Sequence, residues 1–223
     1  MPHEDGTPRV TRSVQQLCTE LAGLFAGAAA EAAIGAQPDS RALGAYVERA
    51  VTDGWKEICA AAGVKALPGP GRRTIYDCAF EEGSTMFGVD ISAKSSDETR
   101  YSDGGICSVD NVVRFLGENR REFLIAQFSY RQVDGGLVLG HCTVVPFRCL
   151  PETALRIENL GTGQFRLNGA LEEHVASLAW NRPTRDFLLT IADMALAHYV
   201  RVASKANERA QAMATFREKV GRQ

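Results

Sequence analysis

The spacing of apolar residues changes twice along this chain of 223 residues, and no other feature constrains the fold as strongly. Apolar side chains recur every three or four positions in residues 13–34, 41–62 and 183–218, which predicts helices. Between them, residues 72–95 and 122–147 hold alternating runs that predict two β-hairpins. We therefore expect an α/β fold with a central mixed β-sheet flanked by helices, and with helical N- and C-terminal parts.

The organisation that these patterns predict is a single domain over residues 1–223. A helical part spans residues 1–66, an α/β core spans residues 72–168, and C-terminal helices span residues 169–223. A chain of this length buries roughly 70–75% of its unfolded surface, which is enough for one sizeable core.

Composition narrows the classes of protein that fit. The chain has 45% hydrophobic and 23% charged residues, which excludes a mainly disordered protein. No apolar run approaches the roughly 20 residues of a membrane helix, and the first residues do not resemble a signal peptide, so we expect a cytoplasmic protein without a membrane segment. The net charge of −2 excludes a DNA binder that relies on overall positive charge, so a nucleic-acid surface must be a local patch.

Residues 88–94, Gly-Val-Asp-Ile-Ser-Ala-Lys, form the most informative stretch. In a strand, alternate side chains share a face, so Asp90, Ser92 and Lys94 point one way and the residues between them face the core. A carboxylate there is a hard oxygen ligand for Mg²⁺, and a lysine can position water or offset charge on a phosphate. A weak surface ion pair between Asp90 and Lys94 explains the same spacing without a metal.

Further carboxylates are predicted near Asp90. Asp77 lies on the preceding strand of the hairpin, so both acids could contact one metal ion. Glu48 or Glu57, on the second predicted helix, could add an outer carboxylate if it faces the sheet, whereas Glu81 and Glu82 lie near the turn and are expected to be solvated.

Asp77, followed by Val89-Asp-Ile-Ser-Ala-Lys94, resembles the PD-(D/E)xK nuclease core of type II restriction endonucleases. The stretches 100–111 and 156–164 also resemble segments of restriction-enzyme-like proteins, so the resemblance covers roughly residues 72–165. It implies a restriction-endonuclease-like fold and Mg²⁺-dependent, sequence-specific cleavage of double-stranded DNA. Asp77 and Asp90 would bind the metal, and Lys94 would be the third catalytic residue. A symmetric homodimer and a DNA methyltransferase that protects the same site are implied as well.

The sequence departs from the family pattern at two positions. Tyr76 stands where the family has proline, and Ser92 stands where it has the second acid. Either Asp90 supplies that acid from one strand repeat earlier, or the acid comes from elsewhere in the fold, as in restriction enzymes with a Ser-x-Lys motif. If neither holds, the alternative is a non-catalytic DNA-binding or regulatory protein on the same fold.

Two segments are candidates for DNA contact. Arg100 and Tyr101 follow the proposed metal strand directly, and their side chains suit phosphate or base contacts. Gln164 and Arg166 follow Gly161 in a predicted tight turn, and such side chains read adenine and guanine in the major groove. An ordinary solvated loop or turn explains each segment equally well.

A competing chemistry would use cysteine. Cys107 stands at the N-terminus of a short helix predicted over residues 107–117, and His141 lies on a later strand, so the two could form a Cys–His hydrolase pair. The six cysteines include no CxxC pair, and in a reducing compartment they are expected to be core thiols.

Overall fold

The computed structural model describes residues 12–32, 43–69, 74–96, 106–133, 136–158 and 163–221. The helices are α1 (Val14–Ala32), α2 (Leu43–Asp53), α3 (Trp55–Ala61), α4 (Val109–Gly117) and α5 (Thr184–Gly221). The strands are β1 (Lys65–Ala66), β2 (Cys78–Glu82), β3 (Thr85–Ser95), β4 (Cys107–Ser108), β5 (Arg121–Val133), β6 (Gly136–Pro146), β7 (Leu155–Glu158) and β8 (Gln164–Leu167). Short 3₁₀ helices occupy Phe147–Cys149, Glu152–Ala154 and Leu171–Ser177.

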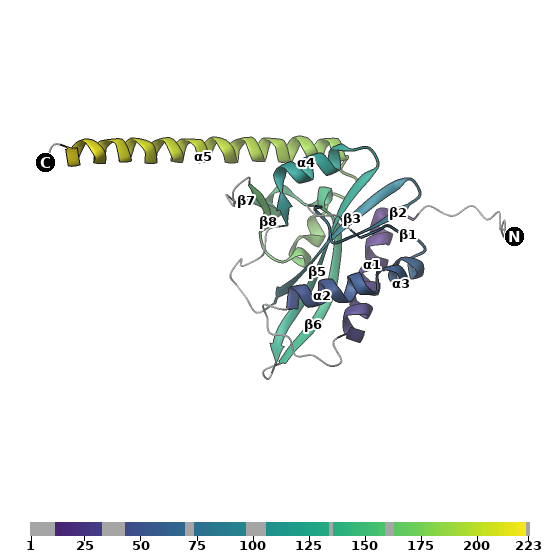
Figure 1. The fold of residues 1–223 in the computed structure, drawn as a ribbon. Helices are drawn as coiled ribbons and strands as arrows, with labels where there is room; N and C mark the ends of the chain where they lie inside the picture. The colour runs from purple at the N-terminus through teal and green to yellow at the C-terminus, as the bar shows by residue number, and fades with distance from the viewer. Residues whose placement is uncertain are drawn as a thin grey trace.

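The central sheet has five strands in the order β1-β2-β3-β5-β6. β3 and β5 pair in parallel, with Val89 opposite Leu124, whereas the other neighbours pair antiparallel. A parallel pair needs a crossover connection, and α4 lies in the segment that joins β3 to β5. The expected α/β fold with a central mixed sheet flanked by helices is confirmed (Figure 1).

Hydrophobic side chains cover both faces of this sheet. On one face, α1, α2 and α3 pack against it, and Trp55 of α3 also donates a hydrogen bond to the carbonyl of Ala79 at 2.9 Å. On the other face, α4, the start of α5 and a small sheet of β4, β8 and β7 surround a second cluster. The interior positions predicted for Val89, Ile91 and Ala93 are confirmed, because all three pack on the α1–α3 side.

The edge of β3 is open over its second half. β2 begins at Cys78, opposite Val89, whereas β3 continues to Ser95. Residues 90–95 therefore pair with β5 on one side, and no described strand pairs with them on the other. This open edge places backbone groups and alternating side chains of β3 within reach of α2 and of the start of β2.

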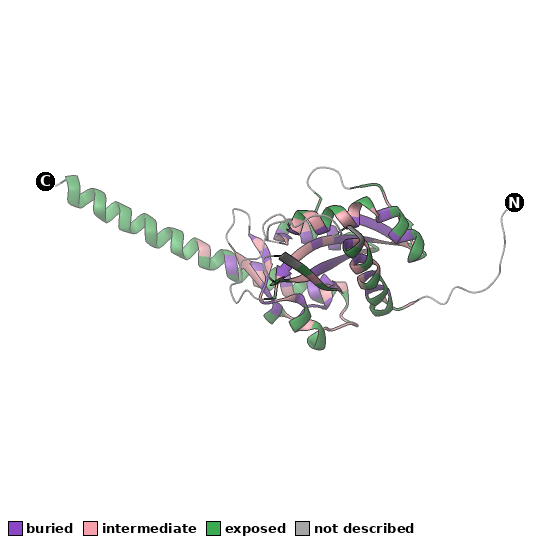
Figure 2. Ribbon diagram, turned by 90° about the horizontal axis from the view of Figure 1, so that it is seen from below, coloured by how far each residue is buried: buried purple, intermediate pink, exposed green. Residues whose placement is uncertain are grey.

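Helix α5 continues beyond the body of the protein. Phe187, Ile191, Ala195 and His198 are buried against the body, and the second half of the helix is exposed along its length (Figure 2). By length and hydropathy alone, α5 also qualifies as a candidate membrane-spanning helix. Of the apolar stretch that meets this criterion, 22% is buried inside the protein.

Several element boundaries differ from the sequence expectations. The helix expected over residues 41–62 divides at Gly54 into α2 and α3, because a glycine in a helix interior lowers its stability. The helix expected from residue 107 begins two residues later, with Ser108 as its cap: the Ser108 hydroxyl accepts a hydrogen bond from the Asn111 N–H.

Candidate active site

Asp77 is anchored at the open edge of β3. Its backbone N–H donates to the carbonyl of Val89 at 2.9 Å, which extends the ladder between β2 and β3 by one residue. Its carboxylate Oδ2 accepts a hydrogen bond from the Ile91 N–H at 2.7 Å. The edge of β3 thus fixes the position of Asp77 through backbone groups, whatever side chains surround it.

Asp90 and Glu48 face a cavity of about 300 Å³ beside this edge. Asp90 comes from β3 and is partly buried, whereas Glu48 reaches the cavity from α2. Ser92, Ile106 and Gln127 also line the cavity. Of the two helix glutamates considered from the sequence, the structure brings Glu48 to the site, whereas Glu57 is exposed on α3. Glu81 and Glu82 form ion pairs with Lys65 and Arg12 instead.

The electrostatics show that the three carboxyl groups lie close enough to interact. Burial raises the pKa of Asp77 to about 6; the hydrogen bond from Ile91 opposes this shift, and the charge of Glu48 adds to it. Burial also raises the pKa of Asp90 well above its usual range, and the charges of Asp77 and Glu48 raise it further. No lysine or arginine of the described residues is among the groups that shift either pKa.

This arrangement fits a hard divalent cation in its donor chemistry. All the acidic donors are carboxylate oxygens, and no described hydrogen bond or ion pair involves the Asp90 carboxylate. Among the described residues, no three acidic, histidine or cysteine side chains lie within the separation of a finished metal site.

The raised pKa values predict how stability depends on pH without metal. An aspartate has a pKa of about 3.9 in the unfolded chain, so the higher folded value of Asp77 means that stability is lost as pH rises through about 6. Asp77→Asn removes this titration and keeps an acceptor for the Ile91 N–H. We expect its free energy of unfolding in EDTA, from urea denaturation, to fall less between pH 5 and pH 8 than that of the wild type. The difference should be about 1 kcal/mol or less after allowing for solvent screening, because the window from pH 5 covers only the last unit of the titration. The same fall in both proteins would contradict the pKa assigned to Asp77.

Lys94 lies on the same face of β3 as Asp90 but in a different hollow. It is 9% exposed and lines a space of about 20 Å³ with Ser129, His141 and Glu172. Four residues along a strand span about 13 Å, which separates the backbone of Lys94 from that of Asp90. Gln127 lines both spaces, so the two hollows adjoin, and its Oε1 accepts the Leu171 N–H at 2.8 Å.

The candidate DNA-contact residues fall into two groups. Arg100 and Tyr101 lie outside the described residues, so their placement as DNA contacts stays a prediction. Gln164 and Arg166 lie in strand β8, not in the tight turn expected from the sequence, because Gln164 pairs with Ser108 of β4 and with Glu158 of β7. Arg166 also forms an ion pair with Glu158, with Nε and Oε2 2.9 Å apart.

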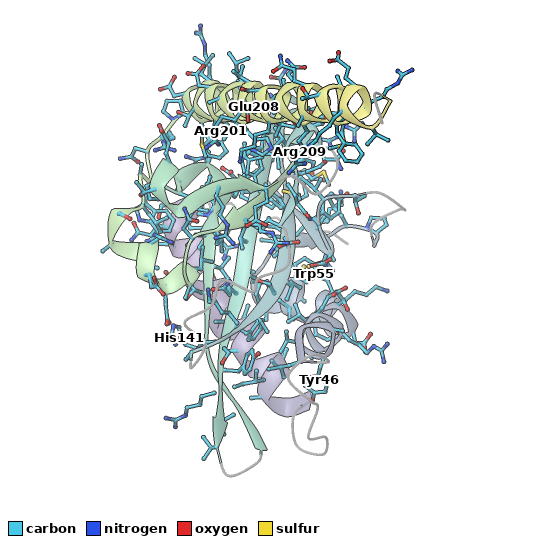
Figure 3. The ribbon with its side chains drawn as sticks, turned by 90° about the vertical axis from the view of Figure 1, so that its left-hand side faces the viewer. Tyr46, Trp55, His141, Arg201, Glu208 and Arg209 are labelled. Atoms are coloured by element: carbon cyan, nitrogen blue, oxygen red, sulfur yellow. The ribbon has the colours of Figure 1, made fainter. Side chains whose placement is uncertain are left out.

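The cysteine alternative finds no support in the geometry. Cys107 is buried at the start of β4, and burial together with the charge of Asp90 raises its pKa well above the usual range, which favours the unreactive thiol. His141 instead forms an ion pair with Glu172, and its Nδ1 lies 3.4 Å from the Ser129 hydroxyl (Figure 3).

Comparisons of the sequence with known proteins identify no relative of this chain. A scan against models of protein families finds no match, and a search of curated proteins finds no significant match.

Proposed function

We propose that this protein is a Mg²⁺-dependent, sequence-specific endonuclease of double-stranded DNA, of the type II restriction class. The convergence of Asp77, Asp90 and Glu48 at the open edge of β3 carries the proposal. A carboxylate withdrawn from water is costly unless it binds a cation or a proton, and burial together with the charges of Asp77 and Glu48 raises the pKa of Asp90. Groups with shifted pKa values gather at functional sites.

The arrangement of the sheet supports a restriction-endonuclease-like fold. The hairpin β2–β3 carries the acids, β5 adds in parallel beside β3 through the crossover that contains α4, and helices flank both faces. This agrees with the core that the motif Asp77 to Lys94 implies.

Each side chain has a separate part in the proposed reaction. Asp77 and Asp90 hold Mg²⁺. Glu48 supplies the second acid of the family pattern, whose usual position is occupied here by Ser92. When bound, the metal polarises the scissile phosphate and lowers the pKa of a water molecule. Lys94, in the adjoining hollow, offsets negative charge on the phosphate or positions the attacking water. A symmetric homodimer on a palindromic site and a protecting methyltransferase belong to the same proposal.

A specific observation favours a second candidate, a non-catalytic DNA-binding or regulatory protein on the same fold. Ser92 occupies the usual acid position, and Lys94 lines a hollow other than the one that holds Asp90. A protein that had lost cleavage but kept its DNA surface would show both features.

Incubation of supercoiled plasmid with the purified protein separates the two functions. The nuclease predicts discrete linear fragments with Mg²⁺ and none with EDTA, because the carboxylates need a cation to act. A gel shift of the plasmid without any cleavage at several Mg²⁺ concentrations would favour the binding protein. Neither cleavage nor a gel shift would contradict both proposals.

A further inference from the structure

A second and larger cavity lies where the parallel strands β3 and β5 begin, whereas Asp90 lies in the middle of β3. Its volume is about 580 Å³, within the range of sites for small ligands. The walls come from the start of β3, the start of β5, the segment after β6 and the N-termini of two helices. Residue 121 of β5, beside the cavity, is four residues before Ile125, which pairs with Asp90, so about 13 Å of strand separates this end from the carboxylates.

Positive charge dominates the wall of this cavity. Four arginines line it, namely Arg120, Arg121, Arg148 and Arg182. Acidic neighbours neutralise two of them: Arg148 pairs with Glu122 at 2.6 Å, and Arg121 pairs with Glu118. Arg182 donates to the carbonyl of Leu150 at 2.9 Å, a neutral acceptor, and Arg120 makes no ion pair with the described residues. Two guanidinium charges therefore remain uncompensated at the cavity.

Two helices direct their N-termini at the same space. Val14 and Gln15 in the first turn of α1, and Thr184 at the start of α5, line the cavity. Free backbone N–H groups and the helix dipole make such ends favourable for anions. α1 has 19 residues and α5 has 38, so both dipoles are fully developed.

The backbone at Arg120 is held in a conformation that side chains avoid. Its φ is 61°, in the left-handed region, and its carbonyl accepts a hydrogen bond from the Met86 N–H at 2.9 Å. Such strain persists only where surrounding contacts enforce it, and it gathers at ligand sites. Here it places an exposed arginine at the rim of the cavity.

The cavity also holds an acceptor that needs a donor. Glu122 is 6% exposed, and its Oε1 is buried without a hydrogen-bond partner among the described residues. Buried carboxylate oxygens are almost always satisfied, so an occupant that carries a hydroxyl would complete this group. Arginine guanidinium groups and helix N-termini, in turn, are the partners that phosphate prefers.

We propose that this cavity binds a small phosphate ester that also carries hydroxyl groups, the class of sugar phosphates and nucleotides. Arg120, Arg182 and the first turns of α1 and α5 hold the phosphate, and Glu122 accepts from a hydroxyl. Trp180 adds an apolar wall. The site is separate from the carboxylates and does not depend on the nuclease.

Calorimetric titration of the full chain with ribose 5-phosphate, in EDTA, tests the proposal. We expect saturable binding by the wild type and none with ribose, which lacks the phosphate. Arg120→Asn should weaken binding about tenfold, because one charge-assisted bond to phosphate is lost while asparagine tolerates the left-handed backbone. Asn181→Asp, which adds a negative charge at the exposed rim, should weaken it at least as much. Both residues are exposed, so both variants should keep the melting temperature of the wild type.

Arg201→Asn is the matched control, because Arg201 is exposed on α5 (Figure 3) and does not line the cavity, so the binding of this variant should equal that of the wild type. Absence of saturable binding, or equal affinity in Arg120→Asn and the wild type, would overturn the site. If Arg120→Asn weakened binding to a DNA duplex while ribose 5-phosphate did not bind, the arginines would contact backbone phosphates and the small-ligand assignment would be wrong.

Discussion

Replacing Asp90 with asparagine is expected to lower Mg²⁺-dependent DNA cleavage by about 10³-fold or more. That loss corresponds to about 4 kcal/mol of transition-state stabilisation, a reasonable share for a metal ligand at a phosphodiester. Asparagine has nearly the same shape but no charge, so it removes the repulsion from Asp77 and Glu48 that raises the pKa of Asp90. We therefore expect the metal-free variant to be at least as stable as the wild type, which shows that lost cleavage is not lost folding. Rates come from plasmid cleavage at saturating protein.

Asp53→Asn is the control for this change, because Asp53 is an exposed aspartate at the end of α2 and does not line the cavity. It should cleave at the rate of the wild type. Cleavage by Asp90→Asn within a few-fold of the wild-type rate would move the metal site away from β3.

Replacing Lys94 with alanine is expected to abolish cleavage and leave DNA binding largely intact. The lysine would act on charge that develops at the phosphate during the reaction, so its loss would raise the barrier more than it would weaken binding. The side chain is buried, so alanine also leaves a cavity. Lys94→Met keeps the volume of the stem and removes only the amine, and it should lose cleavage to the same extent. Gel shifts with duplex DNA in EDTA measure binding separately from cleavage.

Lys65→Ala serves as the control, since Lys65 is an exposed lysine on β1 that pairs with Glu81. It should cut and bind as the wild type does. Normal cleavage by Lys94→Met would show that the separate hollow of Lys94 has no part in the reaction. A positively charged side chain other than Lys94 would then have to act beside the carboxylates.

Local patterns were enough to predict most of the elements. The helices expected over residues 13–34 and 183–218 and the hairpin around residue 83 are confirmed, because period and turn residues are local properties. The parallel pairing of β3 with β5 was beyond such reasoning, because it depends on where the crossover through α4 returns the chain. The small sheet of β4, β8 and β7 was not predicted, since its strands are at most four residues long and show too little alternation to be recognised.

Part of the site could be predicted, because the register of a hairpin is a local property of the sequence. The hairpin register brings Asp77 beside β3 close to Asp90, and a hairpin can be inferred from sequence. The choice of Glu48 over Glu57 depends on the break at Gly54 and on how α2 rotates against the sheet, which are tertiary properties. The separation between Asp90 and Lys94 follows from strand geometry, whereas the reach of the lysine side chain depends on packing. The cavity lined by arginines combines segments from five parts of the chain, so no local pattern indicates it.

Titration of the metal-free protein with Mg²⁺ by calorimetry tests most directly whether the carboxylates at the edge of β3 form a metal site. We expect saturable binding by the wild type that strengthens between pH 5.5 and pH 7.5, as Asp77 loses its proton near pH 6. We also expect that Asp90→Asn weakens this binding at least tenfold, while Asp53→Asn does not change it. Equal Mg²⁺ affinity in Asp90→Asn and the wild type would show that Asp90 holds no metal ion.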